Sequence, residues 1–565
     1  MTMKVSALNF SKLLTPLAMA MAAFALATPS PAAETATAAD AARCEALTQL
    51  RLKDTTVDSA AMVEKGAGVP PGLRDASTLP AFCRVVAHVR SAPDSDIGVE
   101  VWLPVGTWGG VFHGNGNGGF AGVLQGGYGS MVSGLRRGYA VATTDTGTAP
   151  ATPLDGDALI GHPRKWKDWG RLSTHIMTVT GKAIAQAYYG RGATRSYYTG
   201  CSTGGQQGLI EALYYPADYD GILVGAPVIN RTWGHAAVLW DFIAANRTPG
   251  SHLSDAKLRL LNDAAVASCN RRGYGLQGDA FITDPLSCPF DPAELGCQGA
   301  ESDQCLTSAE VATARAFYDG PTTADGRAVF FGWPPGSEVQ GRFGWAFLQS
   351  AANGQPQFGS LFKWVFGADW DWRGFDLDRD MPTVDRALGG DVNDATRGSL
   401  RAFKARGGKL IIYHGLADTL VPPGQSVAFY DRQVHELGGM DQARDVARLF
   451  LAPGLMHCGG GPGPDAFNSA LGGTPQPPVG GPGDDLFASL VDWANGGRAP
   501  DRVIATKFAM GDPKTIQLQR PLCAYPQKAS YDGRGSTSAA ESFVCSSTPN
   551  HSEGNRPEGD KDGQH

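Results

Sequence analysis

Short apolar runs alternate with amphipathic stretches through the first part of the chain. Between residues 172 and 189, apolar side chains recur three and four positions apart, which predicts a helix. Short apolar runs lie before and after this helix. Strands are predicted at 84–89, 97–103, 110–114, 139–144 and 221–225. Because strands separated by helices imply a largely parallel sheet, we expect an α/β fold.

The pattern changes between about residue 230 and residue 382. Helical pieces and loops replace the alternation, and the segment carries four of the ten cysteines and seven of the twelve tryptophans. The α/β pattern resumes with an apolar strand at 409–413. We therefore interpret 230–382 as an inserted lid domain. Most of its tryptophans are expected in its own core, and some are available to line a substrate pocket between the domains.

These changes divide the mature chain into four segments. The core consists of residues 40–229 and 383–545, and the lid at 230–382 separates its two parts. The tail at 546–565 is polar and is expected to be disordered.

The N-terminus has the pattern of a secretory signal peptide. Two lysines precede an apolar, alanine-rich run at 13–26, and small residues allow cleavage after Ala27 or Ala33. The run is too short to span a membrane comfortably, and no stop-transfer pattern follows it. We expect residues 1–33 to be removed, which leaves a secreted or periplasmic protein without a membrane segment.

The charge pattern argues against some classes of partner. The 565-residue chain is 42% hydrophobic and 18% charged, with a formal net charge of −7. It has no long basic run and no basic helix, so neither nucleic acid nor an anionic membrane surface is an expected partner. The sequence leaves the oligomeric state open.

An even number of cysteines in an exported chain predicts a disulfide framework. Pairing of neighbours gives Cys44–Cys83, Cys269–Cys288, Cys297–Cys305 and Cys523–Cys545. Cys201 and Cys458 are then left for each other. A zinc site is the alternative, but no C-x2-C pair or Cys/His cluster at ligand spacing is present.

The stretch Gly200-Cys201-Ser202-Thr203-Gly204 carries the pattern G-x-S-x-G. A strand-prone run at 196–199 precedes it, and a helix-prone run at 206–214 follows it. Strand, sharp turn and helix together are typical of the nucleophile elbow of an α/β-hydrolase fold. The alternative is an ordinary Gly/Ser turn, which the pentapeptide alone would not exclude. In its context, Ser202 is the expected nucleophile.

In this fold the acid and the histidine follow the serine in that order along the chain. Asp418 comes in the loop after the strand at 409–413, and His457 comes in a loop after the last strand, at 449–451. The other later histidines lie in a helical stretch or in the tail. A Cys201–Cys458 disulfide would hold Ser202 and His457 close together. Its loop spans 257 residues, so it could stabilise the fold by roughly 5 kcal/mol.

Ester or amide cleavage by such a triad also needs N–H donors for the oxyanion. The backbone N–H of Thr203 is one candidate, and Gly118, in the glycine-rich loop at 113–120, is the other, with Gly119 as its alternative. A phosphate-binding loop is the alternative for these glycines, but no Lys-Ser/Thr follows them.

Taken together, Cys201-Ser202, Asp418 and His457-Cys458 resemble the tannase and feruloyl esterase family. The resemblance covers nearly the whole mature chain and implies a secreted carboxylesterase with a lid and no cofactor for catalysis. The implied substrates are small esters of aromatic acids: gallate, hydroxycinnamates such as ferulate, or the monoester of terephthalate and ethylene glycol.

The family also commonly holds a structural calcium ion on an aspartate-rich lid loop after a cysteine. In the matching loop at 269–279, only Asp279 remains as a carboxylate; Asn270 replaces an acid, and two arginines are present. Calcium usually needs more than one carboxylate, so this departure argues against the ion.

Two other functions remain open. A peptidase or a general lipid or short-chain esterase would keep the fold and change the substrate. A non-catalytic binding protein would have a broken triad, whereas all three residue types are present here.

Overall fold

The computed structural model describes residues 35–66, 79–149, 152–339, 341–352 and 354–547. The expected signal peptide at 1–33 lies outside these ranges, as does the expected tail from residue 548 onward. Within the described ranges, no helix is long and apolar enough to cross a bilayer.

Nine strands of the described chain form one mixed sheet, in the order β1-β2-β3-β5-β4-β6-β7-β10-β11. Neighbouring strands from β5 through β11 are parallel, and the pairs β1–β2, β2–β3 and β3–β5 are antiparallel. The strands are β1 (Thr55–Val63), β2 (Phe82–Val89), β3 (Ile97–Pro104), β4 (Val111–Asn115), β5 (Ala140–Thr144), β6 (Arg195–Cys201), β7 (Gly221–Gly225), β10 (Lys409–Gly415) and β11 (Ala447–Ala452). The expected α/β fold is thus confirmed.

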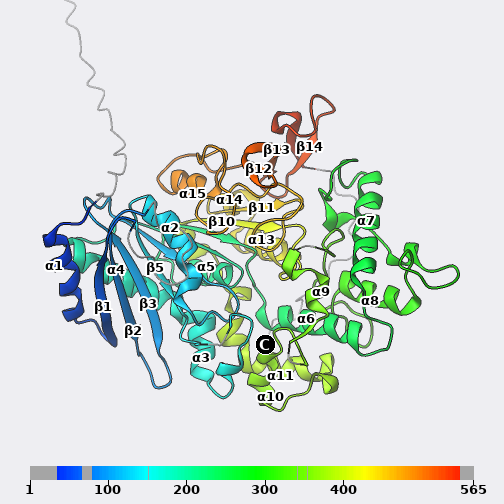
Figure 1. The fold of residues 1–565 in the computed structure, drawn as a ribbon, viewed down its shortest axis with the longest axis horizontal. Coiled ribbons are helices and arrows are strands. Elements are labelled where there is room, and N and C mark those ends of the chain that lie inside the picture. Colours follow the sequence, from blue (N-terminus) through cyan, green and yellow to red (C-terminus); the bar gives the residue numbers. More distant parts are fainter. Residues whose placement is uncertain (1–34, 67–78, 150–151, 340, 353, 548–565) are drawn as a thin grey trace, which may run out of the picture.

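Both faces of the sheet are buried, which explains why the central strands are continuous apolar runs. On β10, Ile412 packs into the core on one face, and Ile411 packs into the core on the other. Helices cover both faces (Figure 1). They are α1 (Ala38–Ala46), α2 (Tyr128–Arg136), α4 (Ser173–Tyr189), α5 (Thr203–Tyr214), α13 (Gly424–Leu437), α14 (Met440–Arg444) and α15 (Leu486–Ala494). The short helix α3 (Pro163–Lys167) instead contacts helix α11 (Leu377–Val392).

A large insertion separates β7 from β10, although these strands are neighbours in the sheet. Figure 1 shows helices α6 to α9 of the insertion on the opposite side of the molecule from β1 and β2. The inserted elements are α6 (Arg231–Asn246), α7 (Asp255–Arg271), α8 (Ser308–Asp319), α9 (Trp345–Leu348), β8 (Ala351–Ala352), β9 (Gln355–Pro356), α10 (Ser360–Phe366), α11 (Leu377–Val392) and α12 (Arg401–Ala405). The lid boundary expected at residue 382 falls inside α11, so the insertion extends beyond it.

The tryptophans of the insertion serve mainly as its core. Four of the seven are buried, and the other three are partly buried. Near the sheet, Phe120 contacts Trp169 and Trp364, with ring centroids 5.3 and 5.4 Å apart, so the glycine loop packs directly against the lid.

Five disulfides join the pairs expected from the sequence: Cys44–Cys83, Cys201–Cys458, Cys269–Cys288, Cys297–Cys305 and Cys523–Cys545. The last of these joins two hairpins at the end of the chain. Their strands are β12 (Arg502–Ala509), β13 (Asp512–Cys523), β14 (Lys528–Tyr531) and β15 (Phe543–Ser546).

Candidate active site

Ser202 forms the sharp turn between β6 and α5. Its φ of 64° and ψ of −121° lie where residues other than glycine are rarely found. Such a turn ends the strand and starts the helix within one residue. The side chain of Ser202 remains partly exposed at the carboxyl end of β6, although its neighbours Cys201 and Thr203 are buried.

The glycines of the motif allow backbones to pass close to each other around this turn. A Cβ atom added to Gly200 would lie 2.6 Å from the carbonyl oxygen of Gly204. A Cβ atom on Gly205 would lie 2.6 Å from the carbonyl oxygen of Gly225, at the end of β7. Real Cβ atoms do not approach so closely, so only glycine permits this local packing.

Asp418 and His457 come together in loops after β10 and β11. The Nδ1 atom of His457 lies 2.8 Å from Oδ2 of Asp418. Asp418 is fully buried, and its other oxygen accepts hydrogen bonds from the backbone N–H groups of Leu420 and Val421, at 2.8 and 3.0 Å. The carboxylate is thereby fixed, and it orients the imidazole ring.

The electrostatic environment keeps Asp418 ionised. Burial alone would raise its pKa, but the charge of His457 and hydrogen bonds from His414 and His457 together hold the pKa well below its ordinary value. His414 is fully buried on β10, with Nε2 3.4 Å from Oδ2 of Asp418. No local pattern in the sequence marks His414 for this role, because the contact depends on how the loop after β10 folds back onto the strand.

The Cys201–Cys458 disulfide joins the residue before Ser202 to the residue after His457, with Cα atoms 5.9 Å apart. In the described part of the chain, no hydrogen bond joins the Ser202 hydroxyl to His457. Catalytic hydrogen bonds are often longer in hydrolases without substrate and tighten when it binds. The structure therefore brings Ser202, His457 and Asp418 into one neighbourhood and directly connects the last two.

The expected oxyanion donors also lie at this end of the sheet. Thr203 is the first residue of α5, where backbone N–H groups have no acceptor within the helix. Its hydroxyl donates to the carbonyl oxygen of Gly119, at 2.8 Å, so the loop that contains Gly118 lies next to the start of α5. Gly118 is exposed, and a Cβ atom there would meet no atom within 4 Å.

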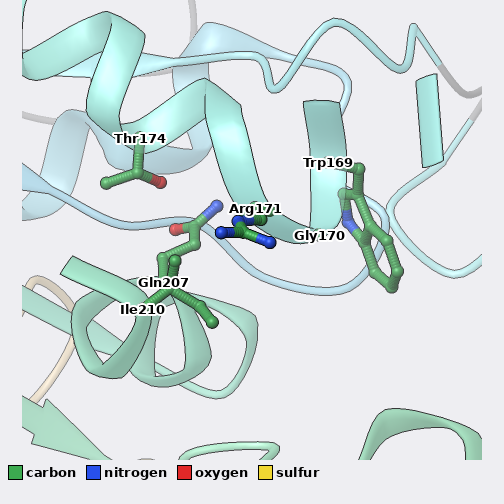
Figure 2. Close-up of a pocket in the computed structure, with 6 residues that line it drawn as sticks. All are labelled: Trp169, Gly170, Arg171, Thr174, Gln207 and Ile210. Atoms are coloured by element: carbon green, nitrogen blue, oxygen red, sulfur yellow. The ribbon is translucent and has the colours of Figure 1, made fainter. Parts of the chain in front are cut away.

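Gln207, which the sequence analysis missed, supports the same loop from α5. Its side chain exchanges hydrogen bonds with Asn117: the Asn117 backbone N–H donates to Oε1, and Nε2 donates to Oδ1. Figure 2 shows Gln207 in a narrow crevice between α5 and the segment that contains Trp169 and Thr174. Neither Ser202 nor His457 lines this crevice, so it is separate from the candidate site.

Comparison with known proteins identifies the family. The model of the tannase and feruloyl esterase family matches residues 83–546. This chain belongs to that family. An uncharacterised esterase of Xanthomonas campestris pv. campestris is 37% identical over 542 residues, which cover 91% of this chain and 92% of that protein. The family makes the chain a carboxylic ester hydrolase.

Two further relatives carry more specific names. A mono(2-hydroxyethyl) terephthalate hydrolase of Piscinibacter sakaiensis is 31% identical over 587 residues, which cover 90% of this chain and 92% of that protein. The crystal structure of feruloyl esterase B from Aspergillus oryzae matches with a TM-score of 0.79 and 25% identity, covering 90% of this chain and all of that one. The α/β-hydrolase architecture with a large insertion is therefore that of the family.

In the loop at 269–279, where the sequence already argues against calcium, the side chains offer a poor site for the ion. The carboxylate of Asp279 is paired with Nη2 of Arg520, at 3.1 and 3.2 Å. The side-chain amide of Asn270 donates to the backbone carbonyl oxygens of Asp279 and Phe281. A single carboxylate that a guanidinium already neutralises is a poor ligand set for calcium. The absence of calcium at Asp279 stays a prediction from the sequence, and the contacts of Asp279 support it.

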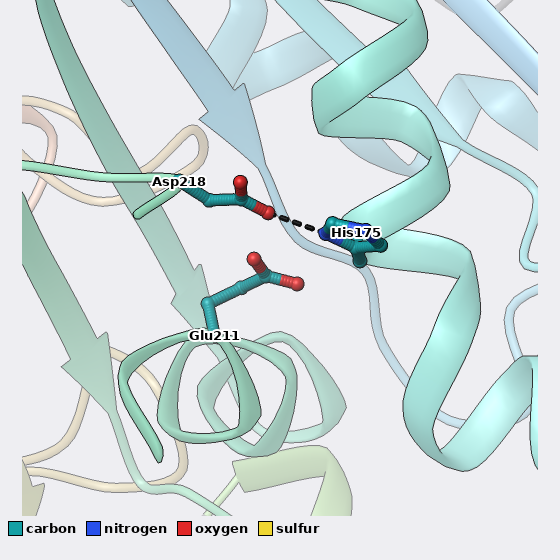
Figure 3. A group of neighbouring side chains, drawn as sticks. All are labelled: His175, Glu211 and Asp218. Atoms are coloured by element: carbon teal, nitrogen blue, oxygen red, sulfur yellow. Dashed lines mark hydrogen bonds and ion pairs between the residues drawn. The ribbon is translucent and has the colours of Figure 1, made fainter. Parts of the chain in front are cut away.

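Among the described residues, three side chains of types that can bind a metal ion lie close together. They are His175 on α4, Glu211 on α5 and Asp218 before β7, and their potential ligand atoms lie within 4.8 Å of one another. Figure 3 shows the Glu211 carboxyl group next to Asp218, which is bonded to His175. Burial and the neighbouring carboxylate of Asp218 raise the pKa of Glu211 well above its ordinary value. Neither carboxyl oxygen of Glu211 has a hydrogen-bond partner in the described part of the chain. A protonated Glu211 carries no charge, so the close approach of the two carboxyl groups does not require a cation.

Proposed function

We propose that this chain is an exported serine esterase that hydrolyses esters of aromatic carboxylic acids. Ser202 is the nucleophile, His457 the general base and Asp418 the acid that orients it. Two linked contacts carry the proposal. His457 contacts the buried Asp418, and the residue after His457, Cys458, forms a disulfide with Cys201, the residue before Ser202.

The reaction follows from the chemistry of these groups. His457 takes the proton of the Ser202 hydroxyl as its oxygen attacks the ester carbonyl carbon, and a tetrahedral intermediate forms. The intermediate collapses to an acyl-enzyme when His457 returns the proton to the leaving alcohol. Water then attacks the acyl-enzyme with His457 again as base, which releases the acid and restores Ser202. Asp418 stays ionised and stabilises the imidazolium in both steps.

The negative charge of each intermediate lies on the former carbonyl oxygen. We assign the backbone N–H groups of Thr203 and Gly118 as its hydrogen-bond donors. Each such donor is worth about 3 kcal/mol in the transition state, because it is in place before the charge develops.

The substrate class is inferred from the relatives. One is named as a terephthalate monoester hydrolase and another as a feruloyl esterase, and both names describe esters of aromatic acids. The proposed substrates are therefore esters of a hydroxycinnamate, a terephthalate monoester or, from the tannase part of the family, esters of gallate. Export is proposed from the signal-peptide pattern and from five disulfides, which persist in oxidising compartments.

A small substrate panel tests the proposal: methyl gallate, methyl ferulate, the terephthalate monoester of ethylene glycol and p-nitrophenyl butyrate. We expect one aromatic ester to be cleaved with a kcat/KM far above that of the butyrate. Hydrolysis of the butyrate alone would favour a general short-chain esterase and contradict the aromatic assignment. Absence of turnover on all four would favour a binding protein.

A further inference from the structure

Arg231 is a buried arginine beside the candidate oxyanion hole. It is the first residue of α6, where the lid begins, and only 4% of its surface is exposed. Its Nε and Nη2 atoms donate to the side-chain oxygen of Gln206, and Nη2 also donates to the hydroxyl of Thr203 at 3.0 Å. The guanidinium lies over the ring of Trp169, 4.7 Å from its centroid.

No acidic group of the described chain balances this charge. All its hydrogen bonds go to neutral oxygens, and burial lowers the pKa of Arg231 to about 9. The charge also lies at the start of α6 and contacts the start of α5, two helix ends that are themselves positive. Buried charges are normally paired, because an unpaired one costs several kcal/mol or more. The site is thus arranged for a negative charge that the protein itself does not supply.

The contacts of Arg231 also connect the two sides of the oxyanion hole. The Thr203 hydroxyl accepts a hydrogen bond from Arg231 and donates its own proton to the carbonyl oxygen of Gly119, at 2.8 Å. The indole N–H of Trp169, beneath the guanidinium, donates to the same carbonyl oxygen at 3.2 Å. Arg231 therefore fixes the residue after the nucleophile and the residue after Gly118 relative to each other.

Another titratable group near Arg231 is His235, one turn further along α6. Burial and the charge of Arg231 lower the pKa of His235 to about 3, so this ring is neutral at ordinary pH. The fixed positive charge at this position is therefore that of Arg231.

We propose that Arg231 is a positioning residue for the oxyanion hole. It holds Thr203 and Gly119 in register, and its buried charge favours the negative charge that develops on the substrate oxygen. It keeps its proton throughout, and it makes no bond to the substrate. The proposal rests on the proposed function, because it requires an anionic intermediate on Ser202.

The test compares Arg231→Met, which removes the charge, with Arg231→Lys, which keeps it. Four quantities are measured: kcat and KM on the best aromatic ester, the affinity of an aryl boronic acid that forms a tetrahedral anion on Ser202, and the affinity of the neutral amide analogue of the ester. We expect Arg231→Met to lower kcat and boronate affinity together by about 10- to 100-fold. KM and amide affinity should change little, and Arg231→Lys should recover part of the loss.

Arg432→Met is the matched control, because this largely buried arginine donates only to backbone carbonyl oxygens of Ala395 and Gly398, away from the site. It should leave the ratio of boronate to amide affinity unchanged. If Arg231→Met weakens both inhibitors equally, or leaves kcat unchanged, the proposal is overturned. Should that variant fail to fold, Thr203→Val removes the hydroxyl that Arg231 contacts, and an unchanged kcat there would equally overturn it. If the wild-type protein binds no boronate, the failure lies with the proposed function instead.

Discussion

Cys201 and Cys458 are bonded to each other with their Cα atoms 5.9 Å apart, and each is adjacent to a residue that we assign to the reaction. Ser202 follows the first cysteine, and His457 precedes the second. The bond closes a loop of 257 residues that includes the whole lid. It therefore fixes nucleophile and base relative to each other without taking part in the chemistry.

Removing this disulfide should reduce the activity by more than the accompanying loss of folded protein explains. In Cys201→Ser/Cys458→Ser, we expect kcat per folded molecule to fall at least about 10-fold, because small displacements of catalytic groups have effects of this size or larger. On chain entropy alone the variant also loses roughly 5 kcal/mol of stability. Activity and the folded fraction, from near-UV circular dichroism, are measured on the same sample at low temperature.

The Cys297→Ser/Cys305→Ser variant is its control, since that disulfide closes a loop of 8 residues within the lid. It should lose less stability and retain its kcat. Equal activity per folded molecule in both double variants would show that the first bond does not position the catalytic groups.

Replacing Asp418 by asparagine should lower kcat by about 10⁴-fold, because the imidazolium loses its counter-charge and His457 is held in the wrong tautomer. Asp485→Asn is a control of matched burial: Asp485 is also fully buried, but it caps α15 and binds Ser469, away from Ser202. That variant should lose stability and keep its kcat. A similar kcat for Asp418→Asn and wild type would remove Asp418 from the mechanism.

The lid should become less stable as the pH rises from about 5 to 8. Burial raises the pKa of Glu338 to about 7 from an ordinary value of 4.5, so the folded lid holds a proton that the unfolded chain releases. This stabilisation is fully present below the pKa that Glu338 has in the unfolded chain, and it is lost as the pH rises through the pKa of Glu338 in the folded protein. Its size is on the order of 3 kcal/mol.

Thermal unfolding at several pH values measures this effect. Glu338→Gln should have a flatter dependence of Tm on pH between 5 and 8, because glutamine cannot lose a proton. Glu294→Gln, an exposed lid residue paired with Arg272, should retain the wild-type slope. Identical slopes for Glu338→Gln and wild type would contradict this assignment.

Chelation of calcium should leave the protein unchanged. Because Arg520 already neutralises Asp279, we expect the same Tm and the same esterase activity with excess EDTA as with added calcium. Conversely, Asp279→Asn should lower Tm modestly, since it leaves the largely buried guanidinium unpaired. A large fall of Tm on EDTA treatment, reversed by calcium, would mean that other groups bind the ion.

The sequence predicts the sheet and the nucleophile turn because their determinants are local. Residues 196–214 combine a strand, closely spaced glycines and a helix, and Gly200, Gly204 and Gly205 each allow a close approach of another backbone segment. Asp418 and His457 could be predicted for a different reason: each follows a predicted strand, and the fold fixes their order along the chain. For His457, the neighbouring Cys458 is a further signal.

Other features depend on contacts between distant segments. Nothing in the sequence around Arg231 predicts that this arginine is buried. Its proposed role depends on a hydrogen bond to Thr203, which lies 28 residues earlier in the chain. The partner of Asp279 is Arg520, 241 residues later. The lid boundary at residue 382 fell at a proline, which usually interrupts a helix, yet α11 continues through Pro382 to Val392.

Covalent labelling of Ser202 tests the central claim most directly. The wild-type protein is treated with an aryl phosphonate ester, which reacts with activated serines, and the modified peptide is identified by mass spectrometry alongside residual esterase activity. We expect one label per molecule, on Ser202, with activity lost in proportion; Ser202→Ala should fold, take no label and have no turnover. A label on another residue that tracks the loss of activity, or an active Ser202→Ala variant, would contradict the assignment.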